Sequence, residues 1–282
     1  MLKSKKISIC GILTCKNKFN SDYYNLETIA KKNKIPIFKK IFKNLDKKKE
    51  FNWMDNLKPD WIIVVGWSYL LKGKILTKYK NRIIGYHPSD LPNNRGRHPL
   101  IWSIFLNIKK IGSTFFLIDK GIDEGHIVSK KYFYYNGKID TMKKLYFKMI
   151  KVACVQMKDI VNFICLNKKI LKIKNKKGNF WRKRNINDGK IDWRMPSEAI
   201  KSLVNGLSWP YIGAHFLFNS KNFKVHSVKI INNKEKIYNN IEPGKVIKVD
   251  KKYFPHIKTL NGVVKISNYE PLRKFNNNDY II

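Results

Sequence analysis

Apolar runs alternate with amphipathic stretches over the first two thirds of the chain. Short and nearly continuous apolar runs predict buried strands at residues 7–13, 35–38, 61–67, 83–86, 112–119 and 127–134. Apolar positions three and four apart predict helices at residues 22–32, 51–57, 100–106 and 140–166, the last one capped by Asp140. Strands that alternate with helices predict an α/β fold with an open, mostly parallel, Rossmann-like sheet and helices on both faces.

The pattern changes after a lysine-dense linker at residues 168–177. Short runs of alternating polarity follow at residues 215–218, 223–231, 245–249 and 262–266, with Asn-Ser, Pro-Gly and Asn-Gly turns near them. These runs predict a small, OB-like β-barrel, preceded by one helix at residues 197–207 that Ser197 caps. We therefore expect two domains, residues 1–178 and residues 185–282.

Composition narrows the class of protein. The net charge is +38, and 51 of the 58 basic residues are lysines that occur in nearly every segment. Because these lysines form no concentrated patch, we favour a biased genome over a phosphate-rich partner as their main source.

No apolar stretch approaches the roughly 18 residues of a membrane span, so we expect no membrane insertion. Four cysteines without paired spacing predict buried thiols in a reduced, cytoplasmic protein, and the histidine spacing predicts no metal site.

The candidate chemistry lies where two predicted strands end. His87 follows the apolar run at residues 83–86, on a loop rich in proline and glycine. Asp123 follows a later strand, within Gly-Ile-Asp-Glu-Gly. In open α/β sheets, ligands bind beyond the carboxyl ends of strands. A histidine oriented by a carboxylate can move protons during acyl transfer. Taken alone, His87 fits a loop anchor equally well, and Asp123 fits a turn residue.

Four segments, in order along the chain, resemble the N10-formyltetrahydrofolate-dependent formyltransferases. That family includes methionyl-tRNA formyltransferase and the sugar N-formyltransferases. The segments are residues 65–68, 87–99, 112–128 and 188–214. The resemblance implies that His87 and Asp123 are the catalytic residues. The family's asparagine, two residues before the histidine, is Gly85 here. This departure removes one hydrogen-bond donor from the usual oxyanion site.

The resemblance also implies two sets of binding residues. The formylated folate, a co-substrate, is expected to contact two loops through Val65, Gly66, Trp67, Leu70, Ile122 and Gly125. The acceptor is expected to contact Tyr86, Ser89, Arg95, Gly96 and Arg97. The two arginines suit a phosphate, or they anchor the loop by salt bridges. The rings of Trp67 and Tyr86 suit stacking on a pterin or a base, or they belong to the core.

Two acceptors fit such an enzyme. We favour the amine of a nucleotide-linked amino sugar, because residues 95–102 resemble the sugar-modifying members and no basic insertion occurs between Gly11 and Ala30. The alternative acceptor is initiator methionyl-tRNA, which suits the charge of +38. Gly85 leaves a third hypothesis, an inactive relative that binds folate or RNA. The sequence leaves open whether the protein forms a homodimer.

Overall fold

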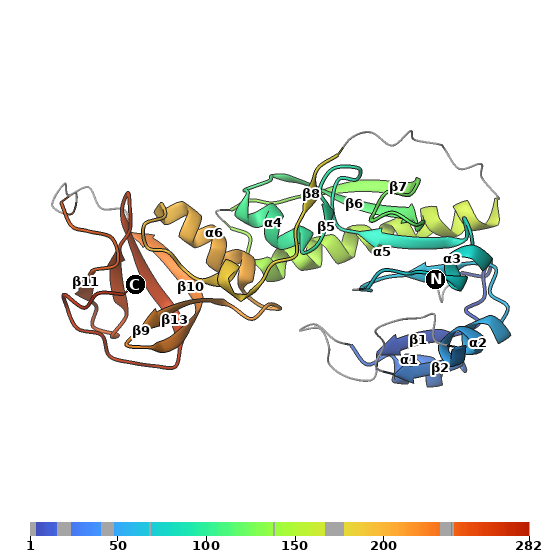
Figure 1. The fold of residues 1–282 in the computed structure, drawn as a ribbon, viewed down its shortest axis with the longest axis horizontal. Helices are drawn as coiled ribbons and strands as arrows, with labels where there is room; N and C mark the ends of the chain where they lie inside the picture. The colour runs from blue at the N-terminus through green and yellow to red at the C-terminus, as the bar shows by residue number, and fades with distance from the viewer. Residues whose placement is uncertain are drawn as a thin grey trace. The chain divides into compact units, whose positions relative to one another are not determined.

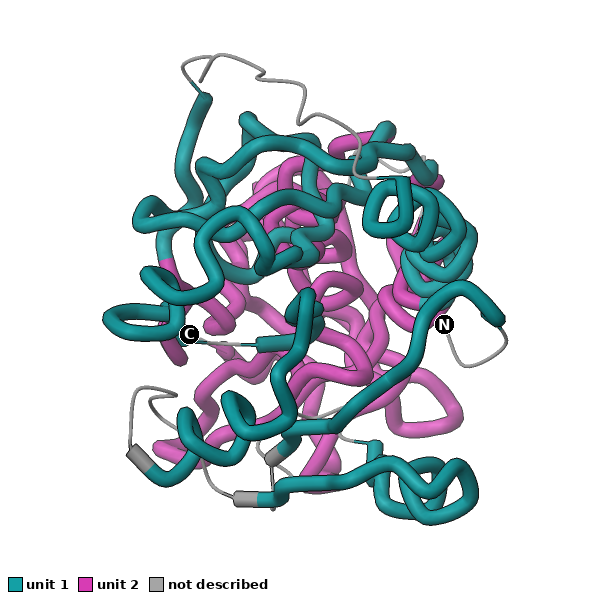
Figure 2. The backbone as a smooth tube through the Cα atoms, turned by 90° about the vertical axis from the view of Figure 1, so that its right-hand side faces the viewer, with its two compact units in different colours: residues 1–99, 110–134, 147–182 teal, residues 100–109, 135–146, 183–282 magenta. Residues whose placement is uncertain are grey.

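The computed structural model describes residues 4–15, 24–40, 48–67, 69–137, 139–166, 178–231, 238 and 240–281. The chain folds into two compact units (Figure 2). The first comprises residues 1–99, 110–134 and 147–182, and the second comprises residues 100–109, 135–146 and 183–282. The domain limits that the sequence suggests, at residues 178 and 185, stay a prediction.

The first unit begins with a pair of parallel strands. Strand β1 (Ile12–Cys15) pairs with β2 (Ile37–Lys40), and helix α1 (Glu27–Lys32) lies between them in the sequence. The strand predicted at residues 7–13 is wrong for residues 7–11, because the pairing with β2 starts at Ile12. The predicted helix start at Asp22 lies outside the described residues.

The main sheet of the first unit joins four strands in the order β3-β4-β6-β7 (Figure 1). Their bounds are Ile62–Val64 for β3, Ile83–His87 for β4, Lys110–Leu117 for β6 and Ile127–Tyr134 for β7. Strands β3 and β4 are parallel, whereas β4–β6 and β6–β7 are antiparallel. The α/β class is confirmed, and the sheet is mixed because β6 returns directly beside β4.

Helices cover both faces of this sheet. Successive residues of a strand point to opposite faces, and Ile83 and Ile84 are both fully buried. Ile83 packs with residues of α2 (Lys48–Asn56) and α3 (Lys74–Lys78). Ile84 packs with Ile160 of α5 (Met142–Cys165). Burial of such a side chain contributes about 1.5–3 kcal/mol. The sequence missed α3, because five residues are too few to show a helical period.

The start of α5 differs from the prediction. Asp140 does not cap the helix; its Oδ2 accepts the backbone N–H of Asn136 at 2.8 Å. The cap is Thr141, whose Oγ1 accepts the N–H of Lys144 at 3.3 Å. A threonine directly before the first helical residue satisfies one of the free N–H groups there. The predicted helix at residues 100–106 is found as α4 (Pro99–Phe105).

The second unit contains an antiparallel sheet in the order β11-β12-β13-β10-β9. The strand bounds are Ala214–Phe218 for β9, Lys221–Ile231 for β10, Val246–Val249 for β11, Pro255–Lys258 for β12 and Val263–Glu270 for β13. Helix α6 (Ser197–Leu207) contacts β10, and a short 3₁₀ helix, η1 (Ile186–Gly189), comes before it in the sequence. The rings of Phe216 and Phe223 stack in the buried core of this unit, with their centroids 5.3 Å apart. The β architecture expected for this part of the chain is confirmed as an antiparallel sheet, and its closure into an OB-like barrel stays a prediction.

Three smaller findings complete the comparison with the sequence. Ser197 is the first residue of α6, not its cap, and its N–H is satisfied by Asn261 Oδ1 at 2.9 Å. The prediction that the cysteine side chains are buried is wrong for three of them, Cys10, Cys154 and Cys165, which are exposed. No helix in the described part of the chain is both long enough and apolar enough to cross a membrane.

Candidate active site

Strand β4 ends at His87, as the apolar run predicts. The loop that follows, residues 88–97, ends in the short strand β5 (Arg95–Gly96), which pairs in parallel with β8 (Phe180–Trp181). Gly96 has a φ of +98°, and a Cβ atom there would lie 2.3 Å from Trp181 O. Only glycine fits this position, because a side chain would meet both backbone strain and a carbonyl oxygen. The far end of the loop is therefore held firmly.

The imidazole of His87 is buried, with a hydrogen-bond contact at Nε2 and a carboxylate facing Nδ1. Nε2 lies 3.1 Å from the backbone oxygen of Asn94, within the same loop. A carbonyl oxygen can only accept, so we place a hydrogen on Nε2. In the neutral ring Nδ1 then carries the lone pair, and it faces Asp123 Oδ2 at 3.7 Å. Nδ1 is therefore the ring nitrogen that faces the carboxylate.

Asp123 is held by the same loop. Its φ is +55°, a left-handed conformation that aspartate tolerates better than most side chains. The backbone N–H of Gly96 donates to Asp123 Oδ2 at 2.9 Å. The side chains of His87 and Asp123 are 9% and 18% exposed, so little water screens them from each other. The structure thus brings the two predicted catalytic residues together, with the carboxylate 3.7 Å from Nδ1, where its charge would stabilise an imidazolium.

A cleft of about 120 Å³, open to solvent, lies beside this pair. Asp123, Gly85 and Tyr86 belong to its wall. The other lining residues are mainly apolar or aromatic and come from the segments after β3 and around the end of β6. They are Val64, Trp67, Tyr69, Leu70, Leu71, Lys72, Phe116, Ile118, Asp119, Lys120 and Gly121. A flat ring with polar edges fits such a surface, because the aromatic faces cover the ring and the charged groups meet its edges.

Gly85 occupies the cleft wall two residues before His87. A Cβ atom at Gly85 would lie 2.8 Å from Ile118 Cγ1 and 3.1 Å from Phe116 Cε1. The space that a larger side chain would need at this position is therefore filled by Ile118. The wall beside the histidine is apolar in this protein.

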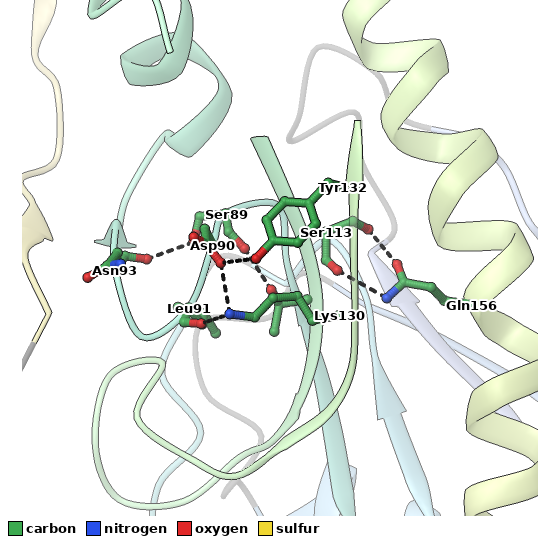
Figure 3. Close-up of polar contacts among 9 residues, drawn as sticks. Ser89, Asp90, Leu91, Asn93, Ser113, Lys130, Tyr132 and Gln156 are labelled. Atoms are coloured by element: carbon green, nitrogen blue, oxygen red, sulfur yellow. Dashed lines mark hydrogen bonds and ion pairs between the residues drawn. The ribbon is translucent and has the colours of Figure 1, made fainter. Parts of the chain in front are cut away.

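Tyr86 connects the cleft to a buried polar network. Burial raises the pKa of Tyr86 to about 12, although its hydrogen bond with Ser113 opposes the shift, and its hydroxyl lies 3.0 Å from Ser113 Oγ. Ser113 Oγ donates to Gln156 Oε1 at 2.6 Å, and Gln156 Nε2 donates to Ser113 O and to Ser129 Oγ, both at 3.0 Å. Figure 3 shows Gln156 reaching Ser113 from α5. This glutamine interrupts the apolar stripe of α5, and it ties the helix to two strands.

The predicted folate residues divide into two groups. Trp67 and Leu70 line the cleft. Val65 is 62% exposed and Ile122 is 39% exposed, and neither belongs to the lining, nor does Gly66. Gly125 packs against β6, where a Cβ atom would lie 1.6 Å from Leu117 O. Ser68 lies outside the described residues.

Among the predicted acceptor residues, several hold the loop in this structure. Arg95 Nη1 lies 3.1 Å from Glu124 Oε1, which makes the salt bridge that was the alternative to phosphate binding. Ser89 is 1% exposed, and its hydroxyl donates to Asn93 O at 3.3 Å. Gly96 contributes its N–H to Asp123, and the backbone N–H of Arg97 donates to Trp181 O at 3.1 Å. Tyr86 alone of this set lines the cleft.

Sequence reasoning missed Asn94 and Ile118. Asn94 acts through its carbonyl, which every residue type possesses, so no sequence signal marks it. Ile118 follows an apolar strand and looks like any core residue. Among the described residues, no group of three or more His, Cys, Asp and Glu side chains is placed to hold a metal ion.

The family comparison covers both parts of the chain. The model of the formyl transferase family matches residues 9–156, and the model of the formyl transferase C-terminal domain matches residues 185–276. Methionyl-tRNA formyltransferase from Clostridium beijerinckii is 32% identical over 224 residues, which cover 78% of this chain and 69% of that enzyme. The enzyme of the same name from Finegoldia magna is 29% identical over 220 residues, which cover 74% of this chain and 66% of that enzyme.

Solved structures share the fold. HypX from Aquifex aeolicus, in complex with tetrahydrofolic acid, has a TM-score of 0.67 and 20% identity, covering 95% of this chain and 45% of that one. Methionyl-tRNA formyltransferase from Clostridium thermocellum has a TM-score of 0.60 and 22% identity, covering 79% of this chain and 94% of that one. Matches to both family models and the relative at 32% identity establish that the chain belongs to the formyltransferase family, whose members are enzymes that transfer formyl groups.

Proposed function

We propose that this protein transfers a formyl group from N10-formyltetrahydrofolate to the amino group of initiator methionyl-tRNA. The observation that carries the proposal is the His87–Asp123 pair beside an aromatic cleft, in a chain whose relatives at 29% and 32% identity are methionyl-tRNA formyltransferases. The comparisons favour this acceptor over the nucleotide-linked sugar that the sequence suggested first. The charge of +38 suits a phosphate-rich partner.

The cleft is the site we assign to the donor. Trp67, Tyr86 and Phe116 provide aromatic surface for a pterin ring, and Lys72, Lys120 and Asp119 provide charged groups at its edges. When bound, the donor supplies a formyl group on a nitrogen that departs as an amine. A relative with the same fold, HypX, has been crystallised with tetrahydrofolic acid, which supports this assignment.

His87 and Asp123 manage the proton in this mechanism. The hydrogen on Nε2 stays with Asn94 O, so Nδ1 accepts the proton that the acceptor amine gives up as it bonds to the formyl carbon. Asp123, steadied by the N–H of Gly96, stabilises the resulting imidazolium. His87 then returns the proton to the departing nitrogen when its bond to the formyl carbon breaks. Because Gly85 leaves the wall apolar, this pair carries more of the catalysis than it would with a donor at that position.

The test is formylation of initiator methionyl-tRNA by the purified full chain, with N10-formyltetrahydrofolate as donor and a panel of nucleotide-linked amino sugars as competing acceptors. We expect turnover of the tRNA, and we expect tRNA affinity to fall by about a thousandfold or more between roughly 50 and 200 mM salt. Turnover of an amino sugar without turnover of the tRNA would overturn the proposal in favour of the first hypothesis. Donor binding without turnover of either acceptor would favour the inactive relative.

A further inference from the structure

Asp90, on the loop that follows His87, forms a polar cluster with Lys130 and Tyr132 of β7, and we call it the Asp90 cluster. Lys130 Nζ donates to Asp90 Oδ1 at 2.8 Å and also to the backbone oxygen of Leu91. The hydroxyl of Tyr132 donates to the same Oδ1 at 3.0 Å. Figure 3 shows both side chains reaching this one carboxylate from β7. Two side chains of β7 therefore hydrogen-bond to one carboxylate of the loop.

The loop also lies directly against the sheet at this point. Thr114 Oγ1, buried on β6, donates to the backbone oxygen of Ser89 at 2.7 Å. A Cβ atom at Gly112 would lie 2.5 Å from Asp90 N, so glycine at this position permits the contact. The start of the loop is thus fixed by backbone contacts as well as by the Asp90 cluster.

A short series of backbone hydrogen bonds connects Asp90 with His87 and Asp123. Asn93 N donates to Asp90 O at 2.9 Å, which closes a turn, and the next residue is Asn94. The carbonyl of Asn94 accepts from His87 Nε2, and the N–H of Gly96 donates to Asp123. Both backbone groups that contact the pair therefore belong to the loop that the Asp90 cluster holds at its start, while Asn179 and β8 hold its end.

We propose that Asp90, Lys130 and Tyr132 are positioning residues, which hold the Asn94 carbonyl in place and so keep the hydrogen of His87 on Nε2. None of the three lines the cleft. The side chains of Lys130 and Asp90 are 24% and 34% exposed, and ion pairs with that much exposure add little to stability. The main effect of the cluster is on geometry, and small displacements of catalytic groups can lower a rate about a hundredfold.

The experiment replaces Lys130 and compares it with its neighbour. Lys131 pairs with Asp159 at 3.5 Å, both side chains being 43% exposed, so Lys131→Met is a matched control that leaves the Asp90 cluster intact. The tautomer of His87 is read by ¹⁵N NMR of histidine-labelled full chain at a pH chosen so that the spectrum shows the neutral ring. The His87→Asn variant identifies the signal. We expect a single Nε2–H tautomer in the wild type and in Lys131→Met, and a mixture of tautomers in Lys130→Met.

The kinetic arm rests on the proposed function. We expect Lys130→Met to lower kcat for methionyl-tRNA about tenfold to a hundredfold with little change in the KM of the donor, and Lys130→Arg to restore most of the rate. Tyr132→Phe removes one hydrogen bond and serves if Lys130→Met fails to fold; we expect a smaller loss of kcat and a partial tautomer change.

The two readouts separate the inference from the proposed function. An unchanged tautomer in Lys130→Met, or in Tyr132→Phe if the first variant does not fold, overturns the inference whether or not kcat falls. A wild-type chain that formylates no tRNA overturns the proposed function, and the NMR measurement then still decides the inference.

Discussion

The two units each contain a carboxylate that bonds to a lysine and has a ring-bearing side chain nearby, and the surroundings of the two carboxylates differ. In the first unit Asp90 meets Lys130 and Tyr132. In the second unit Asp250 bonds to Lys265 and lies 4.0 Å from His256 Nε2. The chemistry of the two clusters is similar. What differs is the neighbouring backbone, which leads to His87 and Asp123 in one case and only to a turn in the other.

The Asp250 cluster orders the turn between β11 and β12. Asp250 Oδ1 accepts the N–H groups of Lys252 and Phe254 at 2.9 and 3.0 Å. Its other oxygen accepts from Lys265 on β13. These contacts lower the pKa of Asp250 to about 2, and the hydrogen bond from Lys265 has the largest effect. A carboxylate–lysine pair therefore indicates a functional role only when the backbone that it holds touches a reacting group.

The largest contrast between the units is expected at the catalytic pair. We expect His87→Asn and Asp123→Asn to lower kcat for methionyl-tRNA formylation by about a hundredfold to ten-thousandfold, because the first removes the proton acceptor and the second removes the charge that stabilises the imidazolium. Asp250→Asn, the control in the second unit, should leave kcat unchanged. Steady-state kinetics and melting temperatures of the three variants check this, and near-normal turnover by either active-site variant would remove both residues from the mechanism.

A change in the cleft wall should act in the opposite direction. Gly85→Asn alone should not raise the rate, because Ile118 fills the space beside Gly85. In the double variant Gly85→Asn/Ile118→Ala the amide has room to donate to the developing oxyanion. We expect kcat at least about tenfold above that of Ile118→Ala alone, since one such donor can be worth a hundredfold or more. Equal rates for the double and single variants would show that a donor at this position does not reach the reacting oxygen.

The contact between the loop and the sheet can be tested without touching a polar side chain. Gly112→Ala places a methyl group 2.4 Å from Ser89 O, so the loop must move. We expect a loss of about 1–3 kcal/mol in the free energy of unfolding, typical of overpacking, together with a several-fold fall in kcat. The control in the second unit is Gly262→Ala, where the new methyl meets only the hydroxyl of Ser197 at 3.1 Å. Denaturant unfolding and kinetics measure both, and an unaffected kcat in Gly112→Ala would contradict the role of the loop.

The smallest expected effect concerns the stability of the second unit. The pKa of Asp250 in the folded protein, about 2, lies below its ordinary value of 3.8, so the stabilisation is complete above about pH 4 and is lost as the pH falls towards 2. Asp250→Asn should therefore lower the melting temperature at pH 7, and the difference from wild type should shrink between pH 4 and pH 2. Calorimetry across this range measures the difference, and a constant difference would contradict the assignment of the ion pair.

Local patterns identified most of the elements and the centre of the site. The apolar run before His87 predicted both β4 and the position of the histidine at its end. The long apolar stripe predicted α5, although Thr141 caps it in place of Asp140. These features are local, because burial imposes a period of two on strands and 3.6 on helices within one segment. Short elements such as α3 escape this signal.

The sequence by itself determined the family and the two kinds of sheet. It also identified His87 and Asp123 as candidate partners in one site. Only the tertiary structure decided that Lys130, one of 51 lysines and 40 residues from Asp90, bonds to the loop that follows His87. It also decided that Arg95 pairs with Glu124, and that His87 Nε2 lies beside a backbone carbonyl. The physical reason is that strand order and register bring distant residues together. Neither the identity of a lysine nor the presence of a carbonyl group records which partner it will meet.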